Sequence, residues 1–137
     1  MTVRLNAYLN FRGEARDVLE WYRNVFGGEL DITTFAEGGM DFDPSEAEFI
    51  MHGWLHTSDG FDLMAADVPS SMPLSAGSSI SLSLSGDDGD ALRRLWDALL
   101  EGGTLTVPLE VAPWGDAFGM LVDRWGVAWL VNISAAS

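Results

Sequence analysis

The sequence lacks several residue types, and each absence excludes a class of function. It has no cysteine, which excludes disulfide bonds, thiolate nucleophiles and cysteine-ligated metals. It also has no lysine, so 21 acidic residues face seven arginines and the formal net charge is −14. A chain with this balance cannot neutralise a run of phosphates, and we therefore expect no nucleic-acid partner.

Long apolar runs are also missing. No run approaches the roughly 20 residues that a helical membrane span requires, and the first residues, MTVRLNAYLN, lack the charged-then-apolar pattern of a signal peptide. We therefore expect a cytoplasmic protein without membrane contact. With 137 residues and 47% apolar content, the chain is expected to form a single domain, residues 1–137.

The chain contains a faint copy of itself, displaced by 75 positions. Trp21 corresponds to Trp96, and the pair Gly27-Gly28 corresponds to Gly102-Gly103. Two copies of about 65 residues are too few and too long for a solenoid. We therefore expect two half-domains that pack into one unit, with a ligand cleft between or within them.

Each copy predicts the order strand, helix, strand, strand, strand. In residues 1–67 the strands are expected at 5–11, 30–35, 48–57 and 61–66, and residues 37–46 are expected to form a loop. The helix stripe consists of Ala15, Val18, Leu19, Tyr22 and Phe26, and Gly27-Gly28 ends it. Residues 68–79, rich in proline, serine and glycine, are expected to be a linker.

The second copy, residues 80–137, repeats this order. Its strands are expected at 80–85, 104–111, 117–123 and 127–133, and Asp87 or Asp88 caps its helix. The stripe of that helix is Leu92, Leu95, Trp96 and Leu99. If each helix covers the apolar face of its own sheet, the polar faces of the first strands point into a shared concavity, the predicted cup. Those polar residues are Asn6, Tyr8, Asn10, Ser81, Ser83 and Ser85.

Two such modules in tandem resemble the vicinal-oxygen-chelate superfamily of glyoxalases, bleomycin-resistance proteins and extradiol dioxygenases. The phrases YLNFRGEARDVLEWYRNVFGGEL, IMHGWLHTSDGFDLMAAD and WGDAFGMLVDRWGVAWLVNI are similar to its PhnB-like branch. The resemblance implies an α+β fold of two βαβββ modules, with a curved, largely antiparallel sheet around the cup and the helices outside. It also implies a homodimer.

In metal-dependent relatives, side chains of the first and last strands of each module hold the ion. The matching positions here are Asn6, Met64, Ser81 and Leu130. This set supplies neither carboxylate nor imidazole, the ligands that a catalytic divalent ion needs. We therefore expect no cofactor; a divalent metal held by His52 with an acid such as Asp67 or Asp116 is the alternative.

The only two histidines, His52 and His56, alternate with Trp54 on one strand, so all three side chains share a face. The opposite face carries Met51, Gly53 and Leu55. Four strand residues separate the histidines by roughly 13 Å, too far to share one ion. His52 lies in the phrase that matches the family, whereas His56 lies near the turn, so His52 is the preferred candidate.

The aromatic candidates for a ligand wall are Trp54, Trp114 and Trp129, although large aromatic side chains more often pack in a core. Asp67 is expected to cap a strand end, and Asp123 is expected to accept local backbone hydrogen bonds in a turn. Some members of the branch carry the label of a demethylubiquinone methyltransferase. The sequence has no strand, glycine-rich turn and helix suited to a nucleotide-type methyl donor, and it does not support that label.

Three hypotheses follow. The first is a binding module that holds a small, partly apolar molecule in the cup; its predicted ligand-binding residues are Asn6, Tyr8, His52, Trp54, Met64, Ser81, Ser83, Trp114, Trp129 and Leu130. The second is an enzyme of isomerase, lyase or hydrolase type with His52 as the general base. The third is a structural or regulatory domain with an occluded cup.

Overall fold

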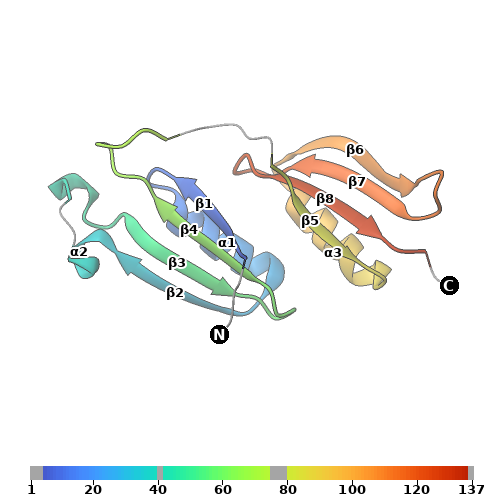
Figure 1. Ribbon diagram of the computed structural model, residues 1–137, viewed down its shortest axis with the longest axis horizontal. Helices are drawn as coiled ribbons and strands as arrows, with labels where there is room; N and C mark the ends of the chain where they lie inside the picture. Colours follow the sequence, from blue (N-terminus) through green and yellow to red (C-terminus); the bar gives the residue numbers. More distant parts are fainter. Residues whose placement is uncertain (1–4, 40–41, 75–79, 136–137) are drawn as a thin grey trace. The chain divides into compact units, whose positions relative to one another are not determined.

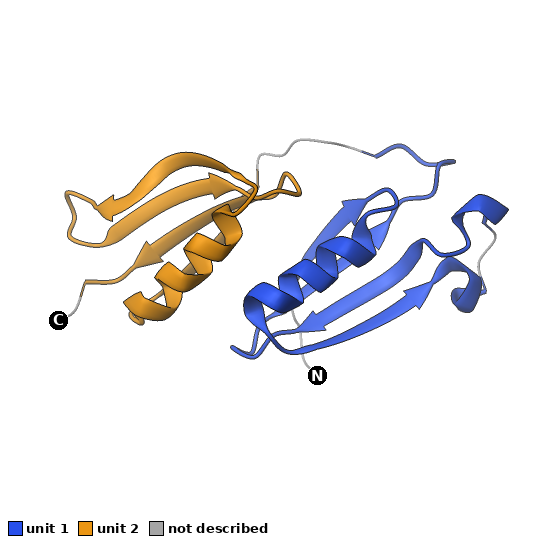
Figure 2. Ribbon diagram, turned by 180° about the vertical axis from the view of Figure 1, so that it is seen from behind, with its two compact units in different colours: residues 1–76 blue, residues 77–137 orange. Residues whose placement is uncertain are grey.

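A computed structural model describes residues 5–39, 42–74 and 80–135. The chain forms two compact units, residues 1–76 and 77–137, shown in two colours in Figure 2. Each unit contains one four-stranded sheet and follows the order strand, helix, strand, strand, strand. The predicted α+β fold with two βαβββ modules is confirmed. Residues 75–79 of the expected linker lie outside the described residues.

The first unit places its strands in the order β1-β4-β3-β2, with β1 parallel to β4 and the other neighbours antiparallel (Figure 1). Its elements are β1 (Ala7–Phe11), α1 (Ala15–Phe26), β2 (Glu29–Thr34), α2 (Phe35–Gly38), a 3-10 turn η1 (Pro44–Glu46), β3 (Ile50–His56) and β4 (Asp62–Asp67). Helix α1 covers one face of this sheet, as the view from behind shows (Figure 2).

Helix α1 forms where the 3.6-residue periodicity predicts it. Its buried residues are Ala15, Val18, Leu19, Tyr22 and Phe26, the complete predicted stripe. Gly27 and Gly28 end the helix with φ values of 73° and 107°, which side-chain-bearing residues rarely adopt. Gly28 also lies against the end of β3, because a Cβ atom there would collide with the His56 carbonyl oxygen.

The start of α1 is held by a carboxylate from the far end of the unit. Asp67, the last residue of β4, is 5% exposed. Its Oδ1 accepts hydrogen bonds from the backbone N–H groups of Gly13 (2.7 Å) and Ala15 (3.1 Å), and its Oδ2 accepts one from Ile50 (2.9 Å). The expected strand-end cap is therefore present, and it joins the helix start to the start of β3.

Two local features of the first unit differ from the sequence expectation. Helix α2 takes up Phe35, the last residue of the expected strand 30–35, and the start of the expected loop 37–46, and a capping box between Thr34 and Glu37 stabilises it. The same loop also contains η1, which Asp43 caps. A β-bulge interrupts the pairing of β2 with β3 at Met51. Ile50, not Met51, therefore occupies the buried position, and the Met51 sulfur lies against Gly38.

The second unit has the strand order β5-β8-β7-β6, again with one parallel pair, β5 with β8. Its elements are β5 (Leu82–Gly86), α3 (Gly89–Leu100), β6 (Thr104–Val111), β7 (Ala117–Val122) and β8 (Ala128–Ile133). Of the two predicted caps, Asp88 is the residue whose side chain accepts from the Ala91 N–H at 3.1 Å. Leu92, Trp96 and Leu99 form the buried stripe of α3.

Among the described residues, no helix is long and apolar enough to span a membrane. The cytoplasmic location stays a prediction.

Candidate functional site

The face of the first sheet that α1 does not cover carries a row of aromatic side chains. On β3 and β4, Gly53 and Ala65 are paired and buried on the α1 side, where a Cβ at Gly53 would overlap a Leu19 methyl group. Side chains alternate along a strand, so the intervening residues of β3 point away from the helix. His52, Trp54 and His56 therefore share the open face, in agreement with the sequence analysis.

The pairing of neighbouring strands places Tyr8 of β1 and Met64 of β4 on the same open face. Met64 is paired with Trp54 on one side and with Tyr8 on the other. The Tyr8 ring stacks on His52 with centroids 5.9 Å apart, His52 meets Trp54 edge-on at 6.1 Å, and Trp54 stacks on His56 at 4.6 Å. We call Tyr8, His52, Trp54 and His56 the aromatic row. Trp54 lies between the two imidazoles, which makes a shared metal ion impossible.

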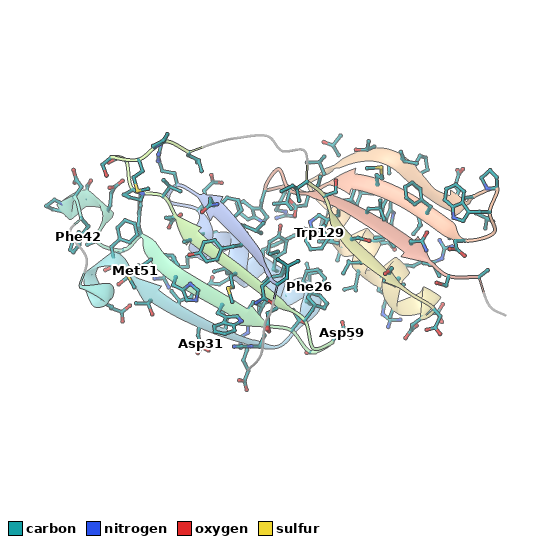
Figure 3. The ribbon with its side chains drawn as sticks, viewed as in Figure 1. Phe26, Asp31, Phe42, Met51, Asp59 and Trp129 are labelled. Atoms are coloured by element: carbon teal, nitrogen blue, oxygen red, sulfur yellow. The ribbon has the colours of Figure 1, made fainter. Side chains whose placement is uncertain are left out.

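The two histidines have different surroundings. The Nδ1 atom of His56 lies 2.9 Å from Asp62 Oδ1, and its Nε2 atom lies 4.0 Å from Asp31 Oδ2. Within the ranges that the structure describes, His52 has ring contacts but neither a hydrogen bond nor an ion pair with a side chain. The imidazole that a carboxylate orients is therefore that of His56, the histidine that sequence reasoning ranked second, and the carboxylate is Asp62. The second acid near His56, Asp31, is labelled in Figure 3.

Asp62 and Asp31 were missed by the sequence analysis. The signal was present, because a hairpin closed by the turn Ser58-Asp59-Gly60 pairs His56 with Asp62 across the two strands. Asp31 follows from the next pairing, since β2 runs antiparallel to β3 and sets Asp31 opposite Trp54. Cross-strand pairs on one face are close enough for side chains to interact.

Two polar groups of the aromatic row are removed from solvent to different degrees. The indole Nε1 of Trp54 is buried and has no hydrogen-bond partner among the described residues. Tyr8 is 46% exposed, and partial burial raises the pKa of its phenol. A buried donor without a partner costs free energy, and the Trp125 Nε1 atom of the second unit is in the same situation among the described residues.

The second sheet also has a face that its helix leaves open. Ser83 is paired with Leu130, and Leu130 with Met120, on the side opposite the buried Val131. Trp114, 63% exposed in the β6–β7 turn, meets Phe118 edge-on at 5.8 Å. The sequence analysis missed Phe118, although alternation along β7 places it opposite the buried Ala117 and Gly119.

The expectation that Trp129 lines a ligand wall is wrong, because its side chain is buried in the core of the second unit. It is 2% exposed, on the buried side of β8 with Val131 and Ile133 (Figure 3). Its Nε1 donates to Asp123 Oδ2 at 2.8 Å. Leu130, its neighbour in the sequence, points to the opposite face. Trp129 is therefore part of the core and not of the open face.

Comparison with known proteins identifies the family. The family model described as 3-demethylubiquinone-9 3-methyltransferase matches residues 4–132. The chain belongs to this family. The protein PA1353 from Pseudomonas aeruginosa is 33% identical, with a TM-score of 0.84 over 98% of this chain and 100% of that one.

Two further solved structures are similar to this chain. One is a putative 3-demethylubiquinone-9 3-methyltransferase, PhnB protein, from Bacillus cereus, with 21% identity and a TM-score of 0.76 over 96% of this chain and 100% of that one. The other is a glyoxylase/bleomycin resistance protein/dioxygenase domain from Frankia sp. EAN1pec, with 14% identity and a TM-score of 0.70 over 100% and 95%. The PhnB-like resemblance is confirmed, and at these identities the two structures show the fold alone.

The four positions that match the metal ligands of this superfamily are divided between the units. Asn6 precedes β1 and Met64 lies in β4, whereas Ser81 precedes β5 and Leu130 lies in β8. Across the described ranges, no group of three or more His, Cys, Asp or Glu side chains is arranged to hold a metal ion. The donor set at the four matching positions is one amide, one thioether, one hydroxyl and one alkyl group, which does not suit a catalytic divalent ion.

The acids proposed as partners of His52 are engaged elsewhere. Both oxygens of Asp67 accept backbone hydrogen bonds on the α1 side of the first sheet, whereas His52 lies on the open face. Asp116 accepts from Asn132 Nδ2 (3.1 Å) and the Ala135 N–H (2.9 Å), and these bonds lower the pKa of its carboxyl group. Asp67 and His52 thus lie on opposite faces of the sheet, an arrangement that does not favour a metal ion shared by the two.

Proposed function

We propose that this PhnB-like protein binds a small, partly apolar molecule on the open face of its first sheet, without a divalent metal. The observation that carries the proposal is the aromatic row. Four rings line one face over two strands, and Trp54 keeps a buried donor without a partner among the described residues. Asn6 and Met64 complete this surface beside Tyr8.

An apolar ligand gains affinity from such a surface because aromatic side chains offer large contact area at low entropic cost. The polar groups at the ends of the row then fix its orientation. Ser81, Ser83, Leu130 and Trp114 of the second sheet stay part of the predicted ligand-binding set, and Trp129 is withdrawn from it.

The test is a ligand screen by thermal shift, with and without divalent ions. The proposal predicts that a stabilising small molecule acts equally well in the presence of a chelator, because binding to the native state raises its stability. Trp54→Leu should abolish that shift, whereas Trp21→Leu, a change on helix α1, should keep it. A large stabilisation by a metal ion alone, at one-to-one stoichiometry, would overturn the proposal.

Methyl transfer is not part of the proposal. A methyl donor of the nucleotide type would need a strand, a glycine-rich turn and a free helix start. At the start of α1, Asp67 already accepts from the N–H of Ala15, the first residue of the helix, and from the N–H of Gly13 just before it. The start of α3 carries the acids Asp88 and Asp90, which disfavour a second negative group.

The enzyme hypothesis names His52 as the general base, whereas the imidazole that a carboxylate holds, as in many general-base sites, is His56, through its hydrogen bond to Asp62. Its test compares His52→Ala with His56→Ala in a substrate screen. His52 as the base predicts activity that His52→Ala abolishes and His56→Ala keeps. Equal activity in both variants would dispose of this hypothesis.

We also propose a homodimer and no nucleic-acid partner. The first comes from the family resemblance, and the second from the net charge of −14. Light scattering coupled to size exclusion measures the oligomeric state. A monomer at micromolar concentration would contradict the dimer.

A further inference from the structure

The end of the aromatic row offers two hydrogen-bond acceptors side by side. Asp62 Oδ1 lies 2.9 Å from His56 Nδ1, which in the neutral ring fixes the proton on Nδ1 and leaves Nε2 as an acceptor. Asp31 Oδ2 lies 4.0 Å from this Nε2. That separation exceeds hydrogen-bond length, so with a neutral ring His56 Nε2 and Asp31 Oδ2 form no hydrogen bond with each other, and both remain acceptors.

A primary ammonium group fits between these two acceptors. A single nitrogen about 2.9 Å from both would meet them at an angle of about 90°, close to the spread of N–H bonds on an ammonium. His56 is 43% exposed and Asp31 is 83% exposed at the side chain, so solvent and ligands reach the acceptors.

The apolar part of such a ligand has a place to lie. Trp54 stacks on His56 with centroids 4.6 Å apart and an interplanar angle of 30°, and the row continues through His52 to Tyr8. An ammonium group near the indole also gains a cation–π attraction. The ring of an aryl ligand would lie along the same row.

The charges on this face favour a cation and disfavour an anion. The open face carries three acidic side chains beside the aromatic row, because Glu29 and Asp62 are paired with His56 and Asp31 is paired with Trp54. In the portion of the chain that the structure describes, no arginine lies in a strand. Arg12, for example, donates to the carbonyl oxygens of Val68, Pro69 and Met72, beyond the end of β4.

We propose that this face binds a small primary amine, with the ammonium group between Asp31 and His56 and the apolar body along Trp54. The inference rests on the proposed function and names the chemical class of its ligand. Asp62 acts here as a positioning residue, because it holds the ring of His56.

The experiment uses three probes of similar shape and different charge: benzylammonium, benzyl alcohol and benzoate. Each is titrated into the full chain while the imidazole signals are followed by NMR. With only two histidines in the sequence, a single His→Ala variant assigns both sets of signals. Benzylammonium should shift the His56 signals, benzyl alcohol should bind at least about tenfold more weakly, and benzoate should not bind.

Two matched variants separate the local contact from the overall charge. Asp31→Asn should weaken benzylammonium binding about tenfold, because it removes a charged hydrogen-bond acceptor. Glu20→Gln, an equal change of charge on the exposed side of α1, should leave it unchanged. Asp31 is exposed on the edge strand β2, so its substitution leaves the fold intact.

Three results would overturn the inference: equal binding of benzyl alcohol and benzylammonium, equal effects of the two variants, or no shift of the His56 signals. The first result, with shifts at His52 and Trp54, would keep the aromatic row as a ligand surface and remove only the ammonium site. Loss of every probe, together with an empty thermal-shift screen, would count against the proposed function as well.

Discussion

The replacement of tryptophan by phenylalanine should have opposite consequences in the two units. Trp129 is buried and its Nε1 donates to Asp123, whereas Trp54 has a buried Nε1 with no partner among the described residues. The same chemical change therefore removes a good hydrogen bond in one unit and an unsatisfied donor in the other.

The magnitudes follow from the contacts. In Trp129→Phe, loss of a hydrogen bond to a charged group costs about 1.5–3 kcal/mol. The smaller ring adds about 1–2 kcal/mol through lost burial and a residual void at a site that is 2% exposed. We expect a total destabilisation of about 2.5–5 kcal/mol.

In Trp54→Phe the terms oppose each other. The lost indole area costs about 1 kcal/mol because the side chain is only partly buried. Removal of an unsatisfied buried donor returns about 1–3 kcal/mol. We expect a net stabilisation of about 0–2 kcal/mol, together with weaker ligand binding at the aromatic row.

Urea unfolding followed by circular dichroism measures both variants, and hydrogen exchange of the β3 and β8 amides assigns each change to its unit. A loss of stability in Trp54→Phe equal to that in Trp129→Phe would refute the reasoning. It would mean that the Trp54 Nε1 atom has a partner in solution.

Three further changes have defined outcomes. Asp67→Asn places an amide N–H against a backbone donor and should cost about 2–4 kcal/mol in urea unfolding; a change below about 1 kcal/mol would contradict the triple hydrogen bond. Gly28→Ala should destabilise by at least about 2 kcal/mol more than Gly60→Ala, because both have positive φ but only Gly28 meets the β3 backbone; equal melting temperatures would be inconsistent with this contact. Because hydrogen bonds lower the pKa of Asp116 in the fold, its stabilisation is present above the unfolded value of 3.8 and is lost as the pH falls through the lowered folded value. Asp116→Asn should therefore melt below the parent chain at pH 7 and converge with it in acid, and a gap independent of pH would argue against this role.

Periodicity was enough to predict the elements that pack against each other. The stripe of α1 and the alternation of His52, Trp54 and His56 both follow from local spacing, and the structure reproduces both. The short helix α2 was missed although its signal was legible, because Thr34 and Glu37 have the spacing of a capping box.

Other features depend on contacts that sequence spacing does not contain. The bulge at Met51 occurs where Asp67, seventeen residues from Ile50, accepts the Ile50 N–H. The side on which Trp129 lies, by contrast, was predictable from alternation. Val131 and Ile133 share its face of β8, whereas the polar Asn132 shares the face of Leu130. The hydrogen bond of Trp129 to Asp123 and its burial agree with this alternation.

The first turns of α1 and α3 are stabilised by carboxylates from different places in the sequence, one distant and one adjacent. Helix α3 receives its cap from Asp88, the residue that directly precedes it, so this turn can form while the rest of its copy is still unfolded. Helix α1 depends on Asp67, which arrives only with the final strand of its copy, and Ile133 occupies the paired end of β8 in the other copy. A chain that stops short of residue 67 therefore lacks the acceptor for the Ala15 N–H, and the first turn of α1 is left without this hydrogen bond.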